Sequence, residues 1–459
     1  MFEKLIAPDL REAIAEGDLA GVAEFIAENH PADSAELLEA LDPDETLLIL
    51  NALEPQLRAD VFCELSGAYQ ADVAELLDAG AMAALATDLD PDDRADLIKA
   101  LPEEDAESVI ASLPRADRED VKRLASYEEG TAGSIMTSEY IALPADLTVF
   151  QAMERIRREA PKKESVYSSY VIDGSRRLLG KLTLRDLIMA EPDGLLESAM
   201  DTQVASAGVD EDREEAVYKL SHYDLLDLPV VDGNGALVGI ITHDDAMDAM
   251  EDEHTQDMER FMAIAGSRED ATYLQTPALE HFRQRVGWLV VLAAFGLVSG
   301  AILQAFESTL SSLMILAFYM PMLAGTGGNT GSQAATMVVR GLSLKEISPA
   351  DALRVLWKEL RVSLLLGLVL GAIAFLRVYY LSGSVPLPPG VTLVSVGMAI
   401  ALALVLQVVS ATVLGAALPL AAARLGADPA LVASPMLATV VDITGLLLYF
   451  GTAKLVLGV

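Results

Sequence analysis

The spacing of apolar residues divides the chain into three stretches. In residues 1–130 apolar side chains recur at i, i+3 and i+4, as Leu37, Leu38 and Leu41 do, which is the pattern of amphipathic helices. Residues 134–250 mix β-branched strands with helical segments, and long apolar runs follow from residue 286. This pattern predicts a multi-domain membrane protein with an all-α helical superhelix, a tandem α/β region, a connecting helix and five transmembrane helices.

The predicted superhelix carries repeated helix-start signals. Leu41-Asp-Pro-Asp-Glu45 and Leu89-Asp-Pro-Asp-Asp93 each place a proline and acids where a helix would begin. Proline suits the first turn of a helix, and carboxylates suit the positive end of its dipole. The intervals are irregular, so we expect only approximate repeats. Four acids of the superhelix are expected to be exposed: Asp60, Asp92, Asp93 and Asp96. We expect them to form a solvated face rather than to bind a metal.

The α/β region contains a duplication with an offset of 59 residues. Val171-Ile-Asp-Gly174 is echoed by Val230-Val-Asp-Gly233, and Gly180-Lys-Leu-Thr-Leu-Arg-Asp186 by Gly239-Ile-Ile-Thr-His-Asp-Asp245. Each unit ends in a helix opened by Thr-x-x-Asp, a capping arrangement. The duplication resembles a pair of CBS domains, which we place at residues 131–198 and 199–250.

The resemblance to CBS pairs implies dimerisation and the sensing of small ligands, often adenine nucleotides. Arg185 and Asp186 are the candidate nucleotide-binding residues, and ATP is a candidate ligand. The positions that would stack on a base are poor, because Ser168 and Ser169 precede the first strand and Leu225 precedes the second.

A connecting helix is predicted from Ala246 to Ala265, within a connecting domain at residues 251–275. Acids and methionines alternate irregularly along it. A rigid helix of this length can transmit movement between domains, and a passive spacer is the other interpretation.

The membrane domain is predicted at residues 276–459. Arg283 and Arg285 precede the first span, several Lys and Arg residues fill the connection between the second and third spans, and Arg424 lies between the fourth and fifth. The positive-inside bias therefore predicts a cytoplasmic N-terminal half and an external C-terminus. No basic region followed by an apolar run begins the chain, so we expect the first span to direct insertion. The five predicted spans are 286–306, 310–339, 362–381, 391–423 and 430–453.

Charge is divided unevenly between the two halves. Of the formal net charge of −37, residues 1–275 hold 62 acidic and 22 basic residues, whereas residues 276–459 hold 7 and 10. The acidic half should repel nucleic acid and attract cations, although acidity also keeps a domain soluble. Cys63 is the only cysteine, so no disulfide is expected. No nucleophile–base pair or phosphate-cradling loop indicates an enzyme.

One acid, Asp442, lies in the middle of the last predicted span. Such a carboxylate costs about 2.5–3.5 kcal/mol on insertion scales, so it should face water, a cation or a basic partner. On a helix it shares a face with Pro435, Ala438 and Gly445, and these small residues suit an ion that keeps its water. Mg²⁺ dehydrates reluctantly and uses one or two carboxylates, which a dimer axis would supply. The structural alternative is a protonated or hydrogen-bonded Asp in a helix interface.

A second polar feature, Pro321-Met-Leu-Ala-Gly-Thr-Gly-Gly-Asn-Thr-Gly-Ser-Gln333, lies in the second predicted span. Its glycines are tolerable where the backbone is buried in protein or lines a cavity. Asn329, Ser332, Gln333 and Thr336 fall on one face of a helix. The alternative role is helix packing, which Gly327, Gly328 and Gly331 could perform while the polar face acts separately.

With this domain order, Pro321–Gln333 and Ser434-Pro-Met-Leu-Ala-Thr-Val-Val-Asp442, the chain closely resembles the MgtE family of magnesium channels. The resemblance implies a homodimer with a pore on its axis, lined by the second and fifth membrane helices. It also implies that cytosolic Mg²⁺ closes this pore. The residues it assigns to the pore are Asp442, Ala438, Asn329, Gly328 and Thr336. The acids it assigns to regulatory Mg²⁺ are Asp92, Asp96, Asp224, Asp245, Asp248, Glu253, Asp257 and Asp428.

The sequence departs from the family at Gln256, where other members can have a second acid beside the connecting-helix Asp257. One ligand of that regulatory site is therefore missing.

From the family resemblance we expect an inner-membrane, Mg²⁺-selective channel surrounded by lipid. An alternating-access carrier of Mg²⁺ or Co²⁺ is the first alternative. A membrane-anchored CBS sensor without transport is the second.

Overall fold

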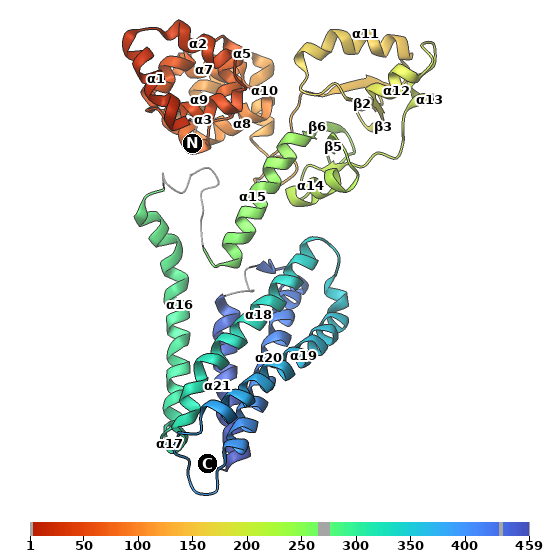
Figure 1. The fold of residues 1–459 in the computed structure, drawn as a ribbon. Coiled ribbons are helices and arrows are strands. Elements are labelled where there is room, and N and C mark those ends of the chain that lie inside the picture. Colours follow the sequence, from red (N-terminus) through yellow and green to blue (C-terminus); the bar gives the residue numbers. More distant parts are fainter. Residues whose placement is uncertain (1–2, 265–275, 431–434, 459) are drawn as a thin grey trace. The chain divides into compact units, whose positions relative to one another are not determined.

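The computed structural model describes residues 3–264, 276–430 and 435–458 (Figure 1). The chain forms two compact units, and α15 contributes to both of them. The N-terminal unit includes the chain up to His254, and the C-terminal unit includes the chain from Thr255 together with the membrane helices. Each unit is described by itself.

Ten short helices form the first part of the N-terminal unit, as predicted. Proline opens several of them, including α4 at Pro43 and α8 at Pro91, which confirms the helix starts expected there. The helices are α1 (Glu3–Glu16), α2 (Leu19–Ala27), α3 (Pro31–Leu38), α4 (Pro43–Leu50), α5 (Pro55–Cys63), α6 (Gly67–Ala74), α7 (Ala79–Asp88), α8 (Pro91–Ala100), α9 (Glu103–Ser112) and α10 (Arg115–Leu124).

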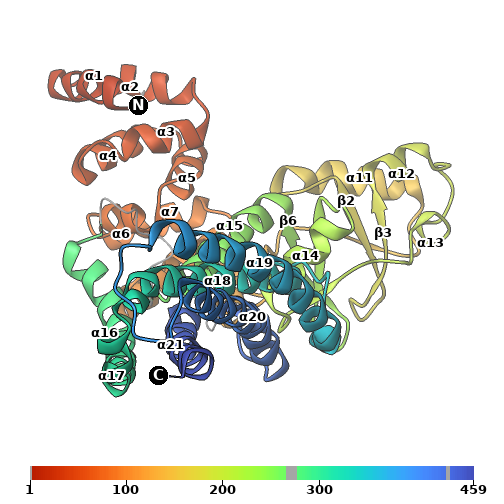
Figure 2. The same cartoon turned by 60° about the horizontal axis from the view of Figure 1, so that its bottom comes forward.

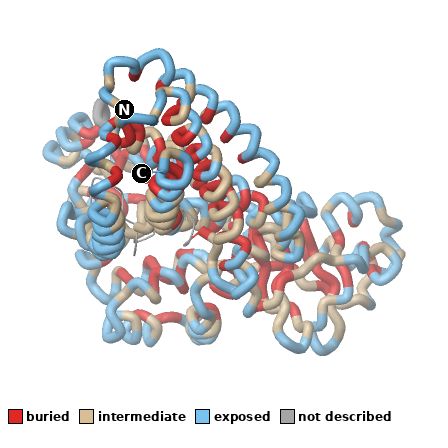
Figure 3. Tube along the Cα trace, turned by 90° about the horizontal axis from the view of Figure 1, so that it is seen from below, coloured by how far each residue is buried: buried red, intermediate tan, exposed pale blue. Residues whose placement is uncertain are grey.

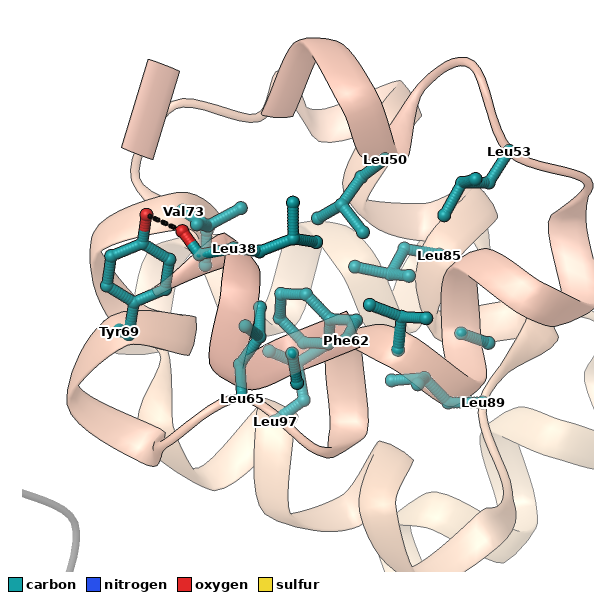
Figure 4. Close-up of a cluster of buried hydrophobic side chains, with 14 of the residues drawn as sticks. Leu38, Leu50, Leu53, Phe62, Leu65, Tyr69, Val73, Leu85, Leu89 and Leu97 are labelled. Carbon is teal, nitrogen blue, oxygen red and sulfur yellow. Dashed lines mark hydrogen bonds between the residues drawn. The ribbon is translucent and has the colours of Figure 1, made fainter. Parts of the chain in front are cut away.

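A single apolar core holds these helices together. Phe62, Leu38 and Leu85 are buried in it (Figure 4). Tyr69 is also buried, and its hydroxyl donates to the carbonyl oxygen of Leu38 at 3.1 Å, so the polar tip of this ring is satisfied. Because this core holds the helices in place, it also fixes the positions of the acids in their first turns.

Two three-stranded sheets follow, one in each half of the duplication. In each sheet the first strand pairs in parallel with the second, and the second pairs antiparallel with the third. The strands are β1 (Ile141–Pro144), β2 (Ser168–Ile172), β3 (Leu178–Thr183), β4 (Ala207–Gly208), β5 (Asp227–Val231) and β6 (Leu237–Thr242). The helices are α11 (Val149–Glu159), α12 (Leu184–Met189), α13 (Leu196–Ala199), α14 (Arg213–His222) and α15 (His243–Phe261).

Each half lends a backbone segment to the sheet of the other. Thr137 bridges to Ile240 in β6, and Asp201 bridges to Lys181 in β3. Gly180 in β3 leaves room for this crossing, because a Cβ there would lie 2.7 Å from Met200 Sδ and 2.8 Å from the Asp201 carbonyl oxygen. Gly239 meets Met136 and Thr137 in the same way. Close backbone approach thus explains Gly180 and Gly239, whereas nothing lies within 4 Å of a Cβ placed at Gly174 or Gly233 of the same motif.

A buried ion pair also joins the two halves. Lys181 Nζ in β3 lies 2.9 Å from Asp227 Oδ1 in β5, and the Tyr170 hydroxyl in β2 donates to the same oxygen at 2.6 Å. Asp227 is completely buried. Both partners therefore satisfy a carboxylate that could not remain charged alone in this interior.

The connecting helix α15 ends earlier than predicted. We expected a helix to Ala265, but α15 ends at Phe261, and Ala263 adopts a left-handed conformation with φ +56°. The Ile264 N–H donates to the Glu259 carbonyl oxygen at 2.9 Å, as in a Schellman cap. The rest of the predicted segment, residues 265–275, lies outside the described residues.

The C-terminal unit consists of long helices. Its elements are α16 (Ala278–Ala305), α17 (Glu307–Ser312), the 3-10 helices η2 (Met314–Tyr319) and η3 (Pro349–Asp351), α18 (Met320–Ser343), α19 (Ala352–Leu381), α20 (Leu393–Arg424) and α21 (Pro435–Leu457). Among the described residues, four helices are long and apolar enough to cross a membrane: Ala278–Ala305, Pro349–Leu381, Leu393–Arg424 and Met436–Leu457.

The second predicted span, 310–339, is corrected by the structure. The chain breaks at Leu313 between α17 and η2, and the long helix α18 begins only at Met320. The glycines and polar side chains of α18 make it less apolar than the four helices above. The third span starts at Ala352, well before residue 362, and the last continues to Leu457. Residues 431–434 of that last prediction lie outside the described part of the chain.

Glycine contacts pack the inner helices, where α18, α20 and α21 lie side by side (Figure 2). A Cβ at Gly415 in α20 would overlap the Gly331 carbonyl group in α18. Buried residues line the inner faces of these helices, and the outer faces are exposed (Figure 3). On α16 no residue is buried, and Leu297 is 75% exposed, so this helix needs lipid or another protein against it.

Candidate cation sites

Three carboxylates of the N-terminal unit converge although they are far apart in sequence. Asp92, Glu164 and Asp245 each offer one oxygen, and these oxygens lie within 4.8 Å of one another. Asp92 lies in the first turn of α8 behind Pro91, and Asp245 lies in the first turn of α15. Glu164 comes from the irregular segment before β2. Carboxylate oxygens gathered in this way are the ligands that Mg²⁺ and Ca²⁺ prefer.

The three acids are costly to ionise together. Burial is the main cause that raises the pKa of Glu164 to about 8 and of Asp245 to about 7, and repulsion from neighbouring carboxylates adds to it. The pKa of Asp92 is raised for the same two reasons. Within the described part of the chain, the buried Asp92 Oδ1 finds no hydrogen-bond partner. A divalent cation would supply the missing positive charge.

Asp245 is held by its own helix cap. The Thr242 hydroxyl donates to Asp245 Oδ2 at 2.5 Å, which confirms the predicted Thr-x-x-Asp arrangement. The equivalent pair in the first half, Thr183 and Asp186, forms a capping box on α12, with 2.6 Å between Thr183 Oγ1 and Asp186 Oδ2. The duplication therefore places a Thr–Asp pair at the start of both helices, and only the second pair carries its acid into the cluster.

Three other predicted regulatory acids are paired with basic side chains of their own chain. Asp96 contacts Lys99 at 3.1 Å, Glu253 contacts Arg213 at 2.6 Å, and Asp428 contacts Arg260 at 3.2 Å. The remaining predicted acids are Asp224 and Asp248, which are exposed, and Asp257, which is half-buried. Of the predicted set, the structure thus gathers only Asp92 and Asp245. It adds Glu164, which sequence reasoning missed because no periodic pattern or motif surrounds it.

In the C-terminal unit, Asp442 lies in the interior of α21 and is half-buried. Among the described residues, none donates a hydrogen bond to its carboxylate or forms an ion pair with it. Ala438, one turn earlier, is also half-buried. This arrangement leaves the carboxylate available to a cation.

The predicted polar face of α18 remains largely exposed in the single chain. Asn329, Gln333 and Thr336 are exposed, whereas the opposite face, with Gly327 and Gly331, is buried. Packing by these two glycines is as expected. The same expectation was wrong for Gly328, because nothing lies within 4 Å of a Cβ placed there. Gly328 therefore belongs to the open side of the helix.

The end of α15 packs close to this region within the C-terminal unit. Phe261 packs against a cluster of buried apolar residues from α18, α20 and α21. The members of this cluster are Ala335, Ala411, Leu437 and Val441. Val441 immediately precedes Asp442, so the connecting helix touches the packing that supports the acid.

Of the two candidate nucleotide-binding residues, Asp186 lines an open hollow of about 450 Å³ together with Met189 and Leu195, and Arg185 is not among its lining residues. Asp186 is engaged in the cap of α12. No aromatic residue is among the described residues that line this hollow, and the predicted base-stacking positions Ser168, Ser169 and Leu225 do not line it either.

Family models match most of the chain, although the membrane helix α16 lies outside them. Residues 320–452 match the MgtE model, described as a divalent cation transporter, and residues 29–130 match the MgtE intracellular N domain. Residues 132–193 and 196–252 match the CBS domain. The magnesium transporter MgtE of Thermus thermophilus is 42% identical over 338 residues, which cover 74% of this chain and 72% of that protein. The chain belongs to the MgtE family.

Further MgtE relatives agree with this assignment. The magnesium transporter MgtE of Bacillus subtilis is 36% identical over 72% of this chain and 71% of its own length. Among solved structures, the cytosolic domain of the Mg²⁺ channel MgtE in complex with ATP has a TM-score of 0.51 at 36% identity. It covers 53% of this chain and 99% of that one. The soluble part of a magnesium transporter has the same TM-score at 28% identity and covers 55% and 99%. These relatives are named as transporters or channels and not as enzymes.

Proposed function

We propose that this MgtE protein carries Mg²⁺ across the cell membrane as a homodimeric channel. The observation that carries the proposal is the half-buried Asp442, which has no donor or cation partner among the described residues. It belongs to a chain whose relatives are magnesium transporters. A hydrated Mg²⁺ would hydrogen-bond to this carboxylate through its waters.

A dimer supports this chemistry better than a single chain. Each chain contributes one carboxylate, and two chains contribute the pair that a hydrated divalent ion prefers. The exposed polar side chains of α18, Asn329 and Gln333, would be unfavourable against lipid but acceptable along a water-filled path. We therefore assign the pore to Asp442, Ala438, Asn329, Gly328 and Thr336, with lipid on the outer helices.

Cytosolic Mg²⁺ is the proposed regulator. Asp92, Glu164 and Asp245 form a cluster whose raised pKa values fall when a cation binds. Driving a gate from 1:99 to 99:1 requires about 5.5 kcal/mol of differential binding, which several weak sites can supply together. The end of α15, through Phe261, would pass this change to the packing beside Asp442. The basic residues between the spans favour a cytoplasmic N-terminal unit and an external C-terminus.

The proposal is tested with the full chain in liposomes. Asp442→Asn keeps the size of the side chain but removes its charge, and we expect Mg²⁺ flux to fall by at least about tenfold, the effect of 1.4 kcal/mol. Asp351→Asn is the matched control, because Asp351 caps a helix start with Ser348. Equal flux in wild type and Asp442→Asn would contradict the pore assignment. Single-channel currents would distinguish a pore from an alternating-access carrier, and an absence of flux in wild type would contradict transport itself.

A further inference from the structure

The side chain of Gln407 in α20 is fully buried, and its amide lies against α18 and α21. It belongs to the middle of α20, within a run of 33 uncharged residues. Its Nε2 donates to the carbonyl oxygen of Val441 in α21 at 3.0 Å. This hydrogen bond therefore links α20 to the residue that immediately precedes Asp442.

Two glycines on different helices make room for the amide. A Cβ at Gly445 in α21 would lie 2.5 Å from Gln407 Nε2 and 2.7 Å from its Cδ. A Cβ at Gly327 in α18 would also overlap Nε2. Any larger residue at either position would displace the amide or separate the helices. The amide thus fills a slot that is built from both helices bearing the assigned pore residues.

The hydrogen bond fixes α21 against its neighbours. Thr444 also donates to the Val441 carbonyl oxygen, at 3.1 Å, but it does so within its own helix. A hydrogen bond within α21 cannot determine the position of α21 along its axis, or its rotation about that axis, relative to α18 and α20. Successive residues on a helix differ by about 100° in direction. A rotation of this size would exchange Asp442 with the buried Val441, so a contact between helices at this level determines where the carboxylate lies.

The oxygen atom of the Gln407 amide is buried without a hydrogen bond from any described residue, which costs free energy. Gln407 Oε1 is buried and has no hydrogen-bond partner in the described part of the chain. Reversing the amide would direct Oε1 at the Val441 carbonyl oxygen, two acceptors facing each other, so the orientation follows from the contact. An apolar residue of similar size would avoid the cost of a buried, unsatisfied acceptor. The cost indicates that the Nε2 contact to α21 is needed.

We propose that Gln407 is a positioning residue for Mg²⁺ passage at Asp442, which sets both the affinity for Mg²⁺ and its discrimination from Ca²⁺. This inference rests on the proposed function. Mg²⁺ keeps its waters in a near-ideal octahedron, so the directions in which these waters can donate to the Asp442 carboxylate are fixed, whereas the 6–8 ligands of Ca²⁺ take irregular arrangements. A shift of the Asp442 carboxylate should therefore weaken the Mg²⁺ site more than it weakens a Ca²⁺ site.

The test measures Mg²⁺ and Ca²⁺ flux into liposomes as a function of ion concentration. Gln407→Leu keeps most of the volume and removes the hydrogen bond. Gly445→Ala keeps Gln407 but fills its slot. In both variants we expect the half-saturating Mg²⁺ concentration to rise by roughly threefold to fifteenfold, the range that one interhelical hydrogen bond supports. The ratio of Mg²⁺ to Ca²⁺ flux should fall. Thr412→Val is the matched control, because Thr412 is a buried residue of α20 whose Oγ1 also has no partner in the described chain.

The two readouts separate positioning from general stability. A loss of folded protein would lower the maximum flux of both ions equally and leave both half-saturating concentrations unchanged, which would overturn the proposal. If Gln407→Leu is not monodisperse in detergent, Gly445→Ala decides by the same measurements. If wild type carries no Mg²⁺, the proposed function fails. If wild type carries Mg²⁺ and both variants match Thr412→Val, only the role of Gln407 fails.

Discussion

Arg260 and Asp428 form an ion pair between the last turn of α15 and the segment before α21, with 3.2 Å between Nη1 and Oδ2. The second guanidinium nitrogen of Arg260 donates to Gln256 Oε1 at 2.9 Å. Gln256 is the position at which the sequence departs from the family pattern. A positive charge of the chain itself therefore sits beside the carboxylate that the family resemblance assigned to Mg²⁺.

The ion pair should favour the closed state of the proposed channel. Both side chains are partly exposed, so we expect the pair to contribute only about 0.2–1 kcal/mol. Arg260→Gln should then raise the cytosolic Mg²⁺ concentration for half-inhibition by about fivefold at most, measured as flux from proteoliposomes. Arg424→Gln removes a charge at the end of α20 and serves as the control. Inhibition at lower Mg²⁺ than in wild type would contradict this role, because it would mean that Mg²⁺ holds Asp428 better than Arg260 does.

The acid cluster predicts a specific pH dependence. Because burial raises the pKa values of Asp245 and Glu164 to about 7 and about 8, the folded unit binds more protons than the unfolded chain between about pH 4 and pH 8. Without Mg²⁺, stability should therefore fall as the pH rises through this window. With Mg²⁺, protons compete for the ligands, so the concentration that half-protects α15 from protease should increase as the pH falls from 8 to 6.

A matched pair of variants isolates the cluster. Asp245→Asn should lose most of the protection by Mg²⁺ and flatten its pH dependence. Asp186→Asn removes the equivalent helix cap in the first half of the duplication and should leave both unchanged. K⁺ at equal ionic strength should not protect. Equal protection by K⁺, or equal effects of the two substitutions, would show that the cluster is only a solvated acidic surface.

The buried pair of Lys181 and Asp227 should matter for stability. Lys181→Met leaves the fully buried Asp227 unpaired, and removal of one partner of such a pair typically costs about 3–5 kcal/mol. Lys181→Met/Asp227→Asn should recover much of this loss in urea unfolding of the full chain followed by near-UV circular dichroism. Arg155→Met, which breaks the more exposed pair with Glu159, should cost less than about 1 kcal/mol. Similar losses for Lys181→Met and Arg155→Met would contradict the role of the buried pair.

Local signals in the sequence were sufficient for much of the fold. The repeated Thr-x-x-Asp motif predicted both helix caps, because a cap depends on residues three positions apart. The polar and glycine faces of α18 also followed from helical spacing, apart from Gly328. The break at Leu313 was missed, since no charge, proline or glycine marks it and the apolar residues after it are continuous with a span.

The candidate sites depend on contacts between distant residues, which periodicity does not encode. Glu164 joins Asp92 and Asp245 from an irregular segment, and Arg260 meets Asp428 across 168 positions. Gln407 is a single amide in a long apolar run, and nothing around it in the sequence indicates that two glycines elsewhere make room for it. Asp442 was found because an intramembrane charge is rare in itself.

The exchange of segments at Thr137 and Asp201 has a consequence for how the CBS halves can evolve and be engineered. Neither half completes its own sheet edge, since each receives a strand-like bridge from the linker that precedes the other. A cut between the halves would leave two open edges and two glycines facing empty space. The duplicated halves are therefore no longer separable modules, and the smallest transplantable piece is the whole pair, residues 131–250.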